Sequence, residues 1–197
     1  MDNSTTDTIE WEELYQQGNT GWDRGEESPN LHHWIENQQL QPCRILVPGC
    51  GNGYEVLYLA KKGFDVVGID ISPSPIKNLT RALKENHLKA ELIQADFFTW
   101  TPDETFDAIY EQTSLCALNP SQWKAYEQSL YSWLKPKGKL LAQFMQTGVE
   151  SGPPFHCDIN NMTVLFPSQR WQWSAEHSTQ VIHSNKKSEK VYLLEKY

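Results

Sequence analysis

Residues 44–70 read RILVPGCGNGYEVLYLAKKGFDVVGID, and this stretch decides the fold. Its apolar run at residues 45–47 predicts a buried strand, because the run is too short for a helix and is followed by proline and glycine. Apolar residues then recur at helical spacing over residues 54–62, and a second apolar run at residues 66–69 ends on Asp70. Strand, glycine turn, helix, strand and terminal carboxylate together predict a βαβ nucleotide-binding unit.

The turn after the first strand contains Gly49, Gly51 and Gly53. Because glycine has no Cβ, a ligand can lie against the bare backbone of such a turn. A dinucleotide site needs G-x-G-x-x-G, whereas the spacing here is G-x-G-x-G and residues 49–59 contain no arginine or lysine. Asp70 lies where a carboxylate can accept hydrogen bonds from both hydroxyls of a ribose. The pattern favours an adenosine without a phosphate chain; the alternative is that the glycines only make the turn.

Length and charge limit the kind of protein. The chain has 197 residues, so we expect a single domain over residues 1–197 with a substantial core. A net charge of −8 and a pI of about 5.2 argue against nucleic-acid and anionic-membrane partners, but not against a small cationic cofactor. No apolar stretch approaches the roughly 20 residues that span a bilayer.

The cysteines do not form a metal-binding pattern. None of them belongs to a C-x-x-C motif, no histidine lies at metal-ligand spacing, and we expect no signal peptide before them. We therefore expect no metal, a cytoplasmic protein with reduced thiols, and cysteines that fill the core. The four cysteines are Cys43, Cys50, Cys116 and Cys157.

The N-terminal region is rich in aromatic residues. Residues 1–8 are polar and expected to be disordered, and residues 9–38 are expected to form helices and an aromatic lid. Trp11 and Tyr15 are one helical turn apart and share a face. Trp22 lies in a glycine-flanked loop, where it either plugs the end of the core or closes over a ligand.

The following elements repeat the strand and helix order. Residues 90–94, 106–110 and 140–145 are expected to be strands of a parallel sheet, whose ligands bind beyond the carboxyl ends of the strands. Asp96 then either accepts a hydrogen bond from an adenine amine beside Phe97, or caps a helix beside core phenylalanines. The ligand-type residues that share this edge are Gly49, Asp70, Asp96 and Gln112.

The C-terminal strands distinguish between two Rossmann-like folds. Residues 170–182 and 190–194 are expected to be two strands that are antiparallel, because the link between them is short. A nicotinamide-dependent oxidoreductase, which we keep as an alternative, would instead continue with a sixth parallel strand. The predicted fold is α/β and Rossmann-like: a seven-stranded, mostly parallel sheet with a C-terminal antiparallel hairpin and helices on both faces, typical of class I S-adenosylmethionine-dependent methyltransferases.

Over about residues 11–166 the chain resembles the thiopurine S-methyltransferase superfamily, and within it the thiol and halide methyltransferases. The motifs that carry the resemblance are W-x-x-x-Y, GWD-x-G-x-x-SP, LVPGCGNGYEV, VVGIDIS, ADFFTW, CALNP and GPPF. The resemblance implies S-adenosylmethionine as cofactor and S-adenosylhomocysteine as product. The cofactor-binding residues that it implies are Trp11, Tyr15, Trp22, Gly49, Gly51, Asp70, Ile71, Asp96, Phe97 and Gln112.

The resemblance also implies a pocket for a small methyl acceptor such as a thiol, hydrosulfide, halide or thiopurine. Its candidate residues are Trp22, Arg24, Gln112, Phe155 and His156, and the related enzymes carry tyrosine at the positions of Gln112 and Phe155. In-line transfer to a soft anion needs alignment and dehydration more than a base, so no catalytic residue is assigned. His156 is either a base for a neutral thiol or a solvated loop residue, and Arg24 either attracts an anionic acceptor or pairs with a neighbour.

The remaining expectations concern assembly and a rival function. We expect a monomer or a weak dimer that has no nucleic-acid or membrane partner. A protein that binds S-adenosylmethionine without catalysis is the second alternative to the methyltransferase.

Overall fold

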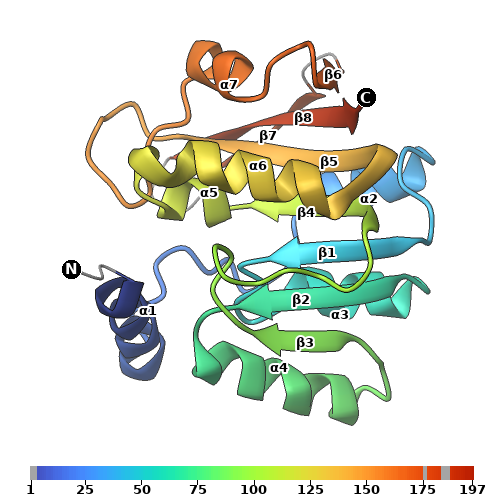
Figure 1. Ribbon diagram of the computed structural model, residues 1–197. Helices are drawn as coiled ribbons and strands as arrows, with labels where there is room; N and C mark the ends of the chain where they lie inside the picture. The colour runs from blue at the N-terminus through green and yellow to red at the C-terminus, as the bar shows by residue number, and fades with distance from the viewer. Residues whose placement is uncertain (1–3, 175–176, 183–186) are drawn as a thin grey trace.

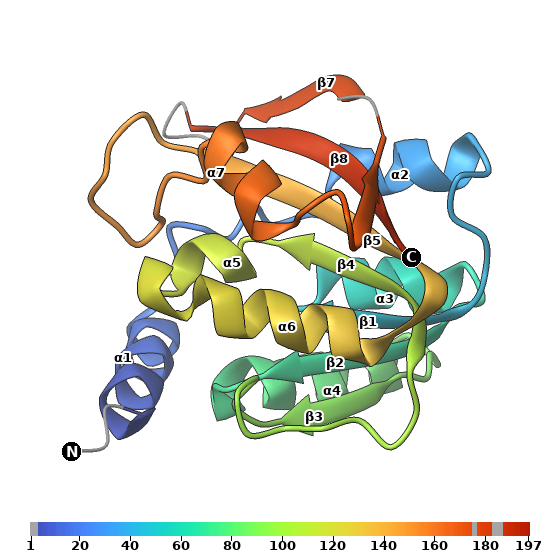
Figure 2. The same cartoon turned by 45° about the horizontal axis from the view of Figure 1, so that its top comes forward.

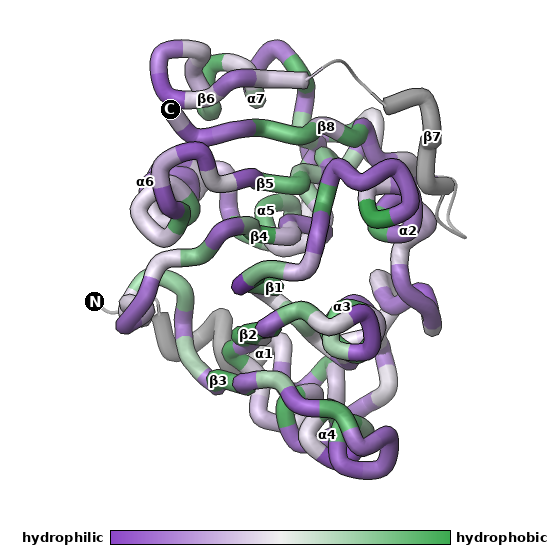
Figure 3. Tube along the Cα trace, turned by 90° about the vertical axis from the view of Figure 1, so that its right-hand side faces the viewer, coloured by the Kyte–Doolittle hydropathy of each residue, from purple (hydrophilic) through white to green (hydrophobic). Residues whose placement is uncertain are grey.

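The computed structural model describes residues 4–174, 177–182 and 187–197. One sheet lies between two layers of helices, with α5, α6 and α7 on one face and α2, α3 and α4 on the other (Figures 1 and 3). The helices are α1 (Ser4–Gln17), α2 (Pro29–Glu36), α3 (Tyr54–Lys61), α4 (Pro73–Glu85), α5 (Ser114–Ala117), α6 (Trp123–Trp133) and α7 (Ile159–Leu165), and a 3-10 turn, η1 (Pro120–Gln122), precedes α6.

The sheet has the order β3-β2-β1-β4-β5-β8-β6, and β7 also pairs with β8. Strands β1 to β5 are parallel, and β8 is antiparallel to β5. Because β6 and β7 both pair with the edge of β8 that faces away from β5, the strands occupy seven positions across the sheet. The strands are β1 (Arg44–Pro48), β2 (Asp65–Asp70), β3 (Glu91–Gln94), β4 (Phe106–Gln112), β5 (Leu134–Gln146), β6 (Trp171–Trp173), β7 (His177–Ile182) and β8 (Ser188–Lys196).

This architecture confirms the predicted fold class. The mostly parallel sheet ends in an antiparallel pair, and a sixth parallel strand is absent from the described part of the chain, so the oxidoreductase pattern does not apply. The strand expected over residues 170–182 is divided into β6 and β7.

The N-terminal prediction needs a correction. Helix α1 begins at Ser4, so part of the segment that we expected to be disordered, residues 1–8, is helical. Extending an existing helix adds one backbone hydrogen bond for each residue that is fixed, so a polar segment without strong helix formers can join it. Residues 1–3 lie outside the described residues.

Two apolar clusters, one on each face of the sheet, hold the layers together. Helix α6 buries Trp123, Tyr126, Leu130 and Trp133, as its spacing predicts. On the opposite face, Ser28 caps α2 and Pro29 occupies its first turn, which directs Trp34 fully into the core.

The parallel strands bring their carboxyl ends to one edge of the sheet, which we call the carboxyl edge. The register pairs Pro48 with Ile69, Asp70 with Gln94 and Gln112 with Gln143. Helix α1 lies beside this edge in both ribbon views (Figures 1 and 2). Within the described ranges, no helix combines the length and the apolar character needed to cross a bilayer.

The C-terminal strands are tied to α6 by a buried carboxylate. Glu127 accepts a hydrogen bond from Trp171 Nε1 at 2.6 Å and one from Arg170 Nη1 at 3.1 Å. The Arg170 guanidinium also lies 3.9 Å from the centre of the Tyr131 ring, as a cation–π contact does. Glu127 therefore satisfies two donors that join β6 to α6.

We expect Glu127→Ala to lower the free energy of unfolding by about 3 kcal/mol, because it leaves a buried indole N–H and a guanidinium without their acceptor. Urea denaturation followed by circular dichroism measures the change. The control is Glu85→Ala at the exposed end of α4, for which we expect a change within about 0.5 kcal/mol. Equal stabilities of the two variants would contradict this role of Glu127.

Candidate functional site

The glycine turn at the carboxyl edge allows other parts of the chain to approach its backbone closely. Gly49, Gly51 and Gly53 all have positive φ values, of 57°, 50° and 74°, which favour glycine. A Cβ on Gly49 would collide with Ser114 Oγ and lie 3.6 Å from the ring of Phe97. The backbone therefore passes close to two neighbouring elements, and only glycine fits there.

Asp70 holds this turn at the tip of β2. Its Oδ2 accepts a hydrogen bond from the Gly51 amide at 2.9 Å, and its Oδ1 accepts one from the Ser72 amide at 2.9 Å. Burial raises the pKa of Asp70, while the amides of Ser72 and Gly51 oppose this shift. A carboxylate has about four lone-pair positions, so acceptor capacity remains for a ligand such as a ribose beside these backbone amides.

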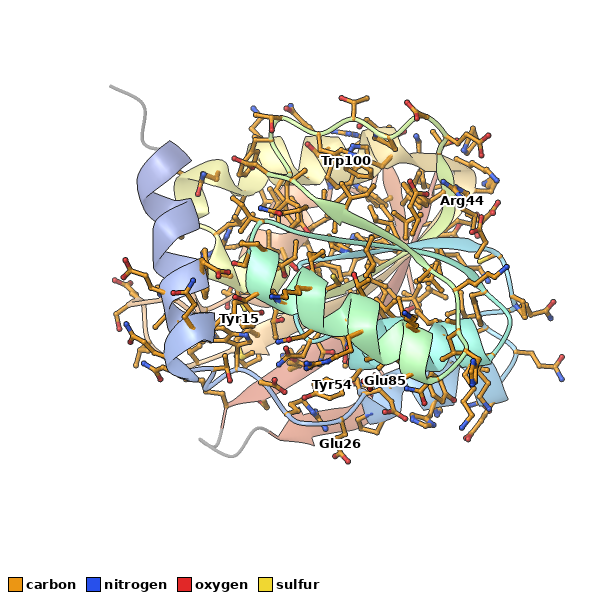
Figure 4. All side chains as sticks on the ribbon, turned by 90° about the horizontal axis from the view of Figure 1, so that it is seen from below. Tyr15, Glu26, Arg44, Tyr54, Glu85 and Trp100 are labelled. Carbon is orange, nitrogen blue, oxygen red and sulfur yellow. The ribbon has the colours of Figure 1, made fainter. Side chains whose placement is uncertain are left out.

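Helix α1 covers the glycine turn. A Cβ on Gly51 would lie 2.9 Å from the Tyr15 hydroxyl, and Figure 4 shows Tyr15 on the side of α1 that faces the sheet. Trp22 packs edge-on against Trp11 and Tyr15, with ring centres 5.2 and 5.6 Å apart. The structure thus brings together three of the residues expected to enclose the cofactor.

Two carboxylates fasten this N-terminal region to the nucleotide-binding unit. Glu12 accepts hydrogen bonds from Ser74 N at 3.0 Å and from Ser74 Oγ, in the first turn of α4. Asp23 accepts one from Asn52 Nδ2 in the glycine turn and one from Tyr54 Oη at 3.4 Å. An acceptor at the first turn of a helix is favourable because the amides there have no partner within the helix.

Asp96 and Phe97 follow β3 at the same edge. The Asp96 carboxylate accepts a hydrogen bond from the Phe98 amide at 2.9 Å, so it caps the turn that follows. Phe97 packs against Tyr126 with ring centres 5.3 Å apart and lies beside Gly49, whereas Phe98 is 37% exposed. Asp96 therefore caps a turn, because the described residues between β3 and β4 contain no helix, and of the two phenylalanines only Phe97 packs against the core. Ile71 follows Asp70 and is half-buried.

Gln112 ends β4 within a buried polar network. Its Oε1 accepts a hydrogen bond from Tyr110 Oη at 2.7 Å, and its Nε2 donates to Glu189 Oε2 on β8 at 2.9 Å. Gln143 Nε2 donates to Tyr110 Oη at 2.7 Å, and Gln143 Oε1 accepts from Ser28 Oγ at 3.0 Å. The network orients the Gln112 amide and joins β4, β5 and β8 to the segment before α2.

Two glutamates at this edge, the buried Glu111 and the half-buried Glu55, were not identified from the sequence. Burial raises the pKa of Glu55 to about 7 and that of Glu111 to about 8. Hydrogen bonds from the Ser28 amide to Glu55 and from the Leu115 amide to Glu111 oppose these shifts. Glu111 and Gln143 could have been noticed because each is a polar residue within an apolar strand, whereas Glu55 carries no such signal.

The loop before α7 carries the two remaining candidates. The Phe155 amide donates a hydrogen bond to Cys116 O at 2.7 Å, which places the half-buried Phe155 beside α5. His156 Nδ1 accepts hydrogen bonds from the amides of Thr147 and Gly148, at 3.0 and 3.3 Å. The proton of the neutral ring is then on Nε2, so this arrangement favours a loop-holding role over a base. Among the described residues, the rings of Trp22 and Phe155 do not contact each other.

The cysteines are all free, and burial raises their thiol pKa values. The value rises to about 12 for Cys157 and to about 11 for the half-buried Cys43, and it lies well above the ordinary value for Cys50 and Cys116. Such thiols are poor nucleophiles. In the part of the chain that the structure describes, the side chains of His, Cys, Asp and Glu do not form a group that could hold a metal ion.

A cavity of about 350 Å³ lies at the opposite edge of the sheet, where Gln39, Cys43 and Lys139 line it. Lys139 donates a hydrogen bond to Gln39 O at 2.6 Å, and Lys135 pairs with Asp107 at 2.7 Å. This cavity is remote from the glycine turn and Asp70.

A comparison with models of protein families shows to which family this chain belongs. The family model of thiopurine S-methyltransferase matches residues 6–196. The chain belongs to the thiopurine S-methyltransferase family. Membership confirms the resemblance found in the sequence and makes the protein an S-adenosylmethionine-dependent methyltransferase.

Several curated relatives are similar over most of the chain. Thiocyanate methyltransferase 1 of Brassica oleracea is 34% identical over 186 residues, which cover 92% of this chain and 82% of that protein. A probable thiol methyltransferase 2 of Arabidopsis thaliana is 35% identical over 161 residues, covering 80% and 71%. A thiopurine S-methyltransferase of Pseudomonas putida (strain GB-1) is 26% identical over 198 residues, covering 90% and 89%.

Solved structures of methyltransferases share the fold. The Burkholderia thailandensis 1,6-didemethyltoxoflavin-N1-methyltransferase, solved with S-adenosylhomocysteine, has a TM-score of 0.77 at 14% identity and covers 96% of this chain and 86% of that chain. The magnesium protoporphyrin IX methyltransferase of Synechocystis PCC 6803, solved with S-adenosylmethionine, has a TM-score of 0.76 at 14% identity, covering 97% of each chain. At these identities the likeness concerns the fold alone.

The buried Glu111 of this methyltransferase should make the stability of the fold depend on pH. Its pKa in the folded protein, about 8, lies above its ordinary value of 4.5, so between these values the folded state binds more protons than the unfolded state. Stability attributable to the protonated carboxyl is therefore complete below about pH 4.5 and is lost as the pH rises through about 8.

We expect Glu111→Gln, which cannot ionise, to remove this loss. The melting temperature of the variant relative to the parent should rise from about pH 5 to about pH 8.5 by several degrees. Differential scanning calorimetry at both pH values measures it, with Glu150→Gln in an exposed loop as the control. A difference between variant and parent that does not change with pH would refute a neutral Glu111.

Proposed function

We propose that the protein transfers the methyl group of S-adenosylmethionine to a small sulfur nucleophile, such as hydrosulfide or a thiol, or to another soft nucleophile such as a halide. The observation that carries the proposal is the make-up of the carboxyl edge, where a bare glycine turn and Asp70 adjoin a neutral Gln112 amide. The relatives named for thiocyanate, thiol and thiopurine acceptors support a sulfur acceptor.

The residues of the carboxyl edge fit the cofactor. The Asp70 carboxylate has acceptor capacity left for ribose hydroxyls, and the glycine turn carries no cation for a phosphate. The rings of Trp11, Tyr15 and Trp22 suit a cation, because aromatic faces attract positive charge. When bound, S-adenosylmethionine supplies a methyl group on a positively charged sulfur. A soft nucleophile takes the methyl carbon by in-line attack, and the sulfur leaves as the neutral thioether of S-adenosylhomocysteine.

The protein's own contribution is positioning and exclusion of water. The network that fixes Gln112 gives the acceptor pocket one rigid wall, and the Phe155 loop closes it from the side of α5. His156 Nδ1 is occupied by two backbone amides, so the proposed reaction uses acceptors that arrive as anions. A thiolate or hydrosulfide is nucleophilic without a base, which matches this arrangement.

A panel of methyl acceptors tests the function. The purified protein is incubated with S-adenosylmethionine and with hydrosulfide, alkyl thiols, a thiopurine, iodide and, as hard-nucleophile controls, a phenol and an amine. We expect methylated product from one or more soft acceptors and none from the hard ones. Binding of S-adenosylhomocysteine without transfer to any soft acceptor would favour the non-catalytic alternative.

We expect Asp70→Ala to weaken S-adenosylhomocysteine binding by about 100-fold or more, because the ligand loses charge-assisted hydrogen bonds and the glycine turn loses its support. Isothermal titration calorimetry measures the affinity, and circular dichroism checks the fold. The control is Asp103→Ala, in an exposed loop. Equal affinities of Asp70→Ala and the parent would contradict the proposal that Asp70 binds the cofactor.

We expect Phe155→Ala to lower kcat for the preferred acceptor by about 10-fold, because water then enters the acceptor side of the pocket, while the affinity for S-adenosylhomocysteine stays within about twofold. Steady-state kinetics and calorimetry provide the two values. Val149→Ala, in the same loop and 54% exposed in the parent, is the matched control. A loss of cofactor affinity with unchanged kcat would place Phe155 at the cofactor instead.

A further inference from the structure

Arg24 has hydrogen-bond donors that the fold does not use. Its Nε and Nη1 are buried and have no hydrogen-bond partner within the described part of the chain. The third nitrogen, Nη2, lies 3.8 Å from Glu26 Oε1, and the Glu26 side chain is 72% exposed, so this is a weak surface ion pair. Buried donors without acceptors are costly, and at a functional edge they indicate a ligand that supplies the acceptor.

The backbone on both sides of Arg24 is fixed. On one side, Asp23 accepts hydrogen bonds from Asn52 and Tyr54 of the nucleotide-binding unit. On the other side, Ser28 donates to Gln143 at 3.0 Å through its hydroxyl and to Glu55 at 3.2 Å through its amide. The guanidinium is therefore carried by a short segment that is anchored at both ends to the carboxyl edge.

The carboxylates near Arg24 are directed elsewhere. Glu55 lies close enough for the positive charge of Arg24 to lower its pKa against the effect of burial, yet its Oε1 accepts from the Ser28 amide. Glu189, whose charge also reaches Glu55, accepts from Gln112. Arg24 is thus close to the acceptor-side network without being hydrogen-bonded to it.

We propose that Arg24 is an anion-binding residue of the methyltransferase site, in which its unused N–H groups bind a small monoanion. The inference rests on the proposed function and extends it by naming the charge of the ligand group. Two ligands carry such a group, namely the carboxylate of the methionine part of the cofactor and an anionic methyl acceptor. Both need the same chemistry, a guanidinium with free donors.

Arg24→Gln tests the proposal, with Arg81→Gln on the exposed face of α4 as a control that removes the same charge. Calorimetry gives the Kd of S-adenosylhomocysteine, and initial rates at saturating cofactor give the KM of iodide, whose charge does not change with pH. A rise of about 10- to 100-fold in the Kd assigns the cofactor carboxylate, and the same rise in the KM alone assigns the acceptor. Arg24→Lys, which keeps the charge but not the planar donors, should fall between the parent and Arg24→Gln.

A double variant distinguishes direct anion binding by Arg24 from a structural role in which Arg24 acts through Glu55. If Arg24 acts only by keeping Glu55 ionised, Arg24→Gln has no further effect in the Glu55→Gln background; direct anion binding predicts that the effect persists there. Melting temperatures of the ligand-free variants show whether they fold. Unchanged Kd and KM in Arg24→Gln, with the parent active, would overturn the inference and leave the proposed function standing. A parent that neither binds S-adenosylhomocysteine nor shows a saturable rise in melting temperature with iodide would overturn both.

Discussion

The carboxylate of Asp70 is the constraint on which the rest of the site depends. It terminates β2 and accepts the amides of Gly51 and Ser72, so one side chain fixes both the glycine turn and the start of α4. The turn takes positive φ angles at alternate residues, which costs little for glycine. Tyr15 of α1 and the Asp23 carboxylate both contact the turn that these two hydrogen bonds hold.

The polar network on the other side of the edge has a different character. It consists of neutral groups and buried carboxylates that satisfy one another, from Ser28 through Gln143 and Tyr110 to Gln112 and Glu189. In a low-dielectric setting such a network is rigid when it is complete and costly when one member is lost. The network thereby joins the segment before α2 to the ends of β4, β5 and β8.

The sequence was sufficient for the fold and for placing the glycine turn and Asp70 at the carboxyl edge. The glycine turn, Asp70 and the final antiparallel pair follow from local spacing and short connections, and the structure has all of them. The contact of Gln112 with Glu189 could not be predicted in this way, because it joins residues that lie far apart in the chain and on separate strands.

The raised pKa values of two glutamates could not be predicted either, because local sequence patterns do not give tertiary contacts. Burial decides the pKa of Glu55 and Glu111, and burial depends on tertiary packing that no local pattern contains. The extended α1 was missed because polar residues 4–8 carry no apolar periodicity. Arg24 was recognised as a candidate in the sequence, but its two buried nitrogens without a hydrogen-bond partner among the described residues could be found only in the folded chain.

The placement of α1 has a practical consequence for handling the protein. In Figure 1, α1 lies at the carboxyl edge, whereas the C-terminal residue lies at the other end of the sheet. The Tyr197 amide donates to Arg170 O at 3.0 Å, beside β6. An affinity tag, fluorophore or surface-immobilisation handle is therefore better attached at the carboxyl terminus, since a fusion at the amino terminus would extend from α1 beside the carboxyl edge.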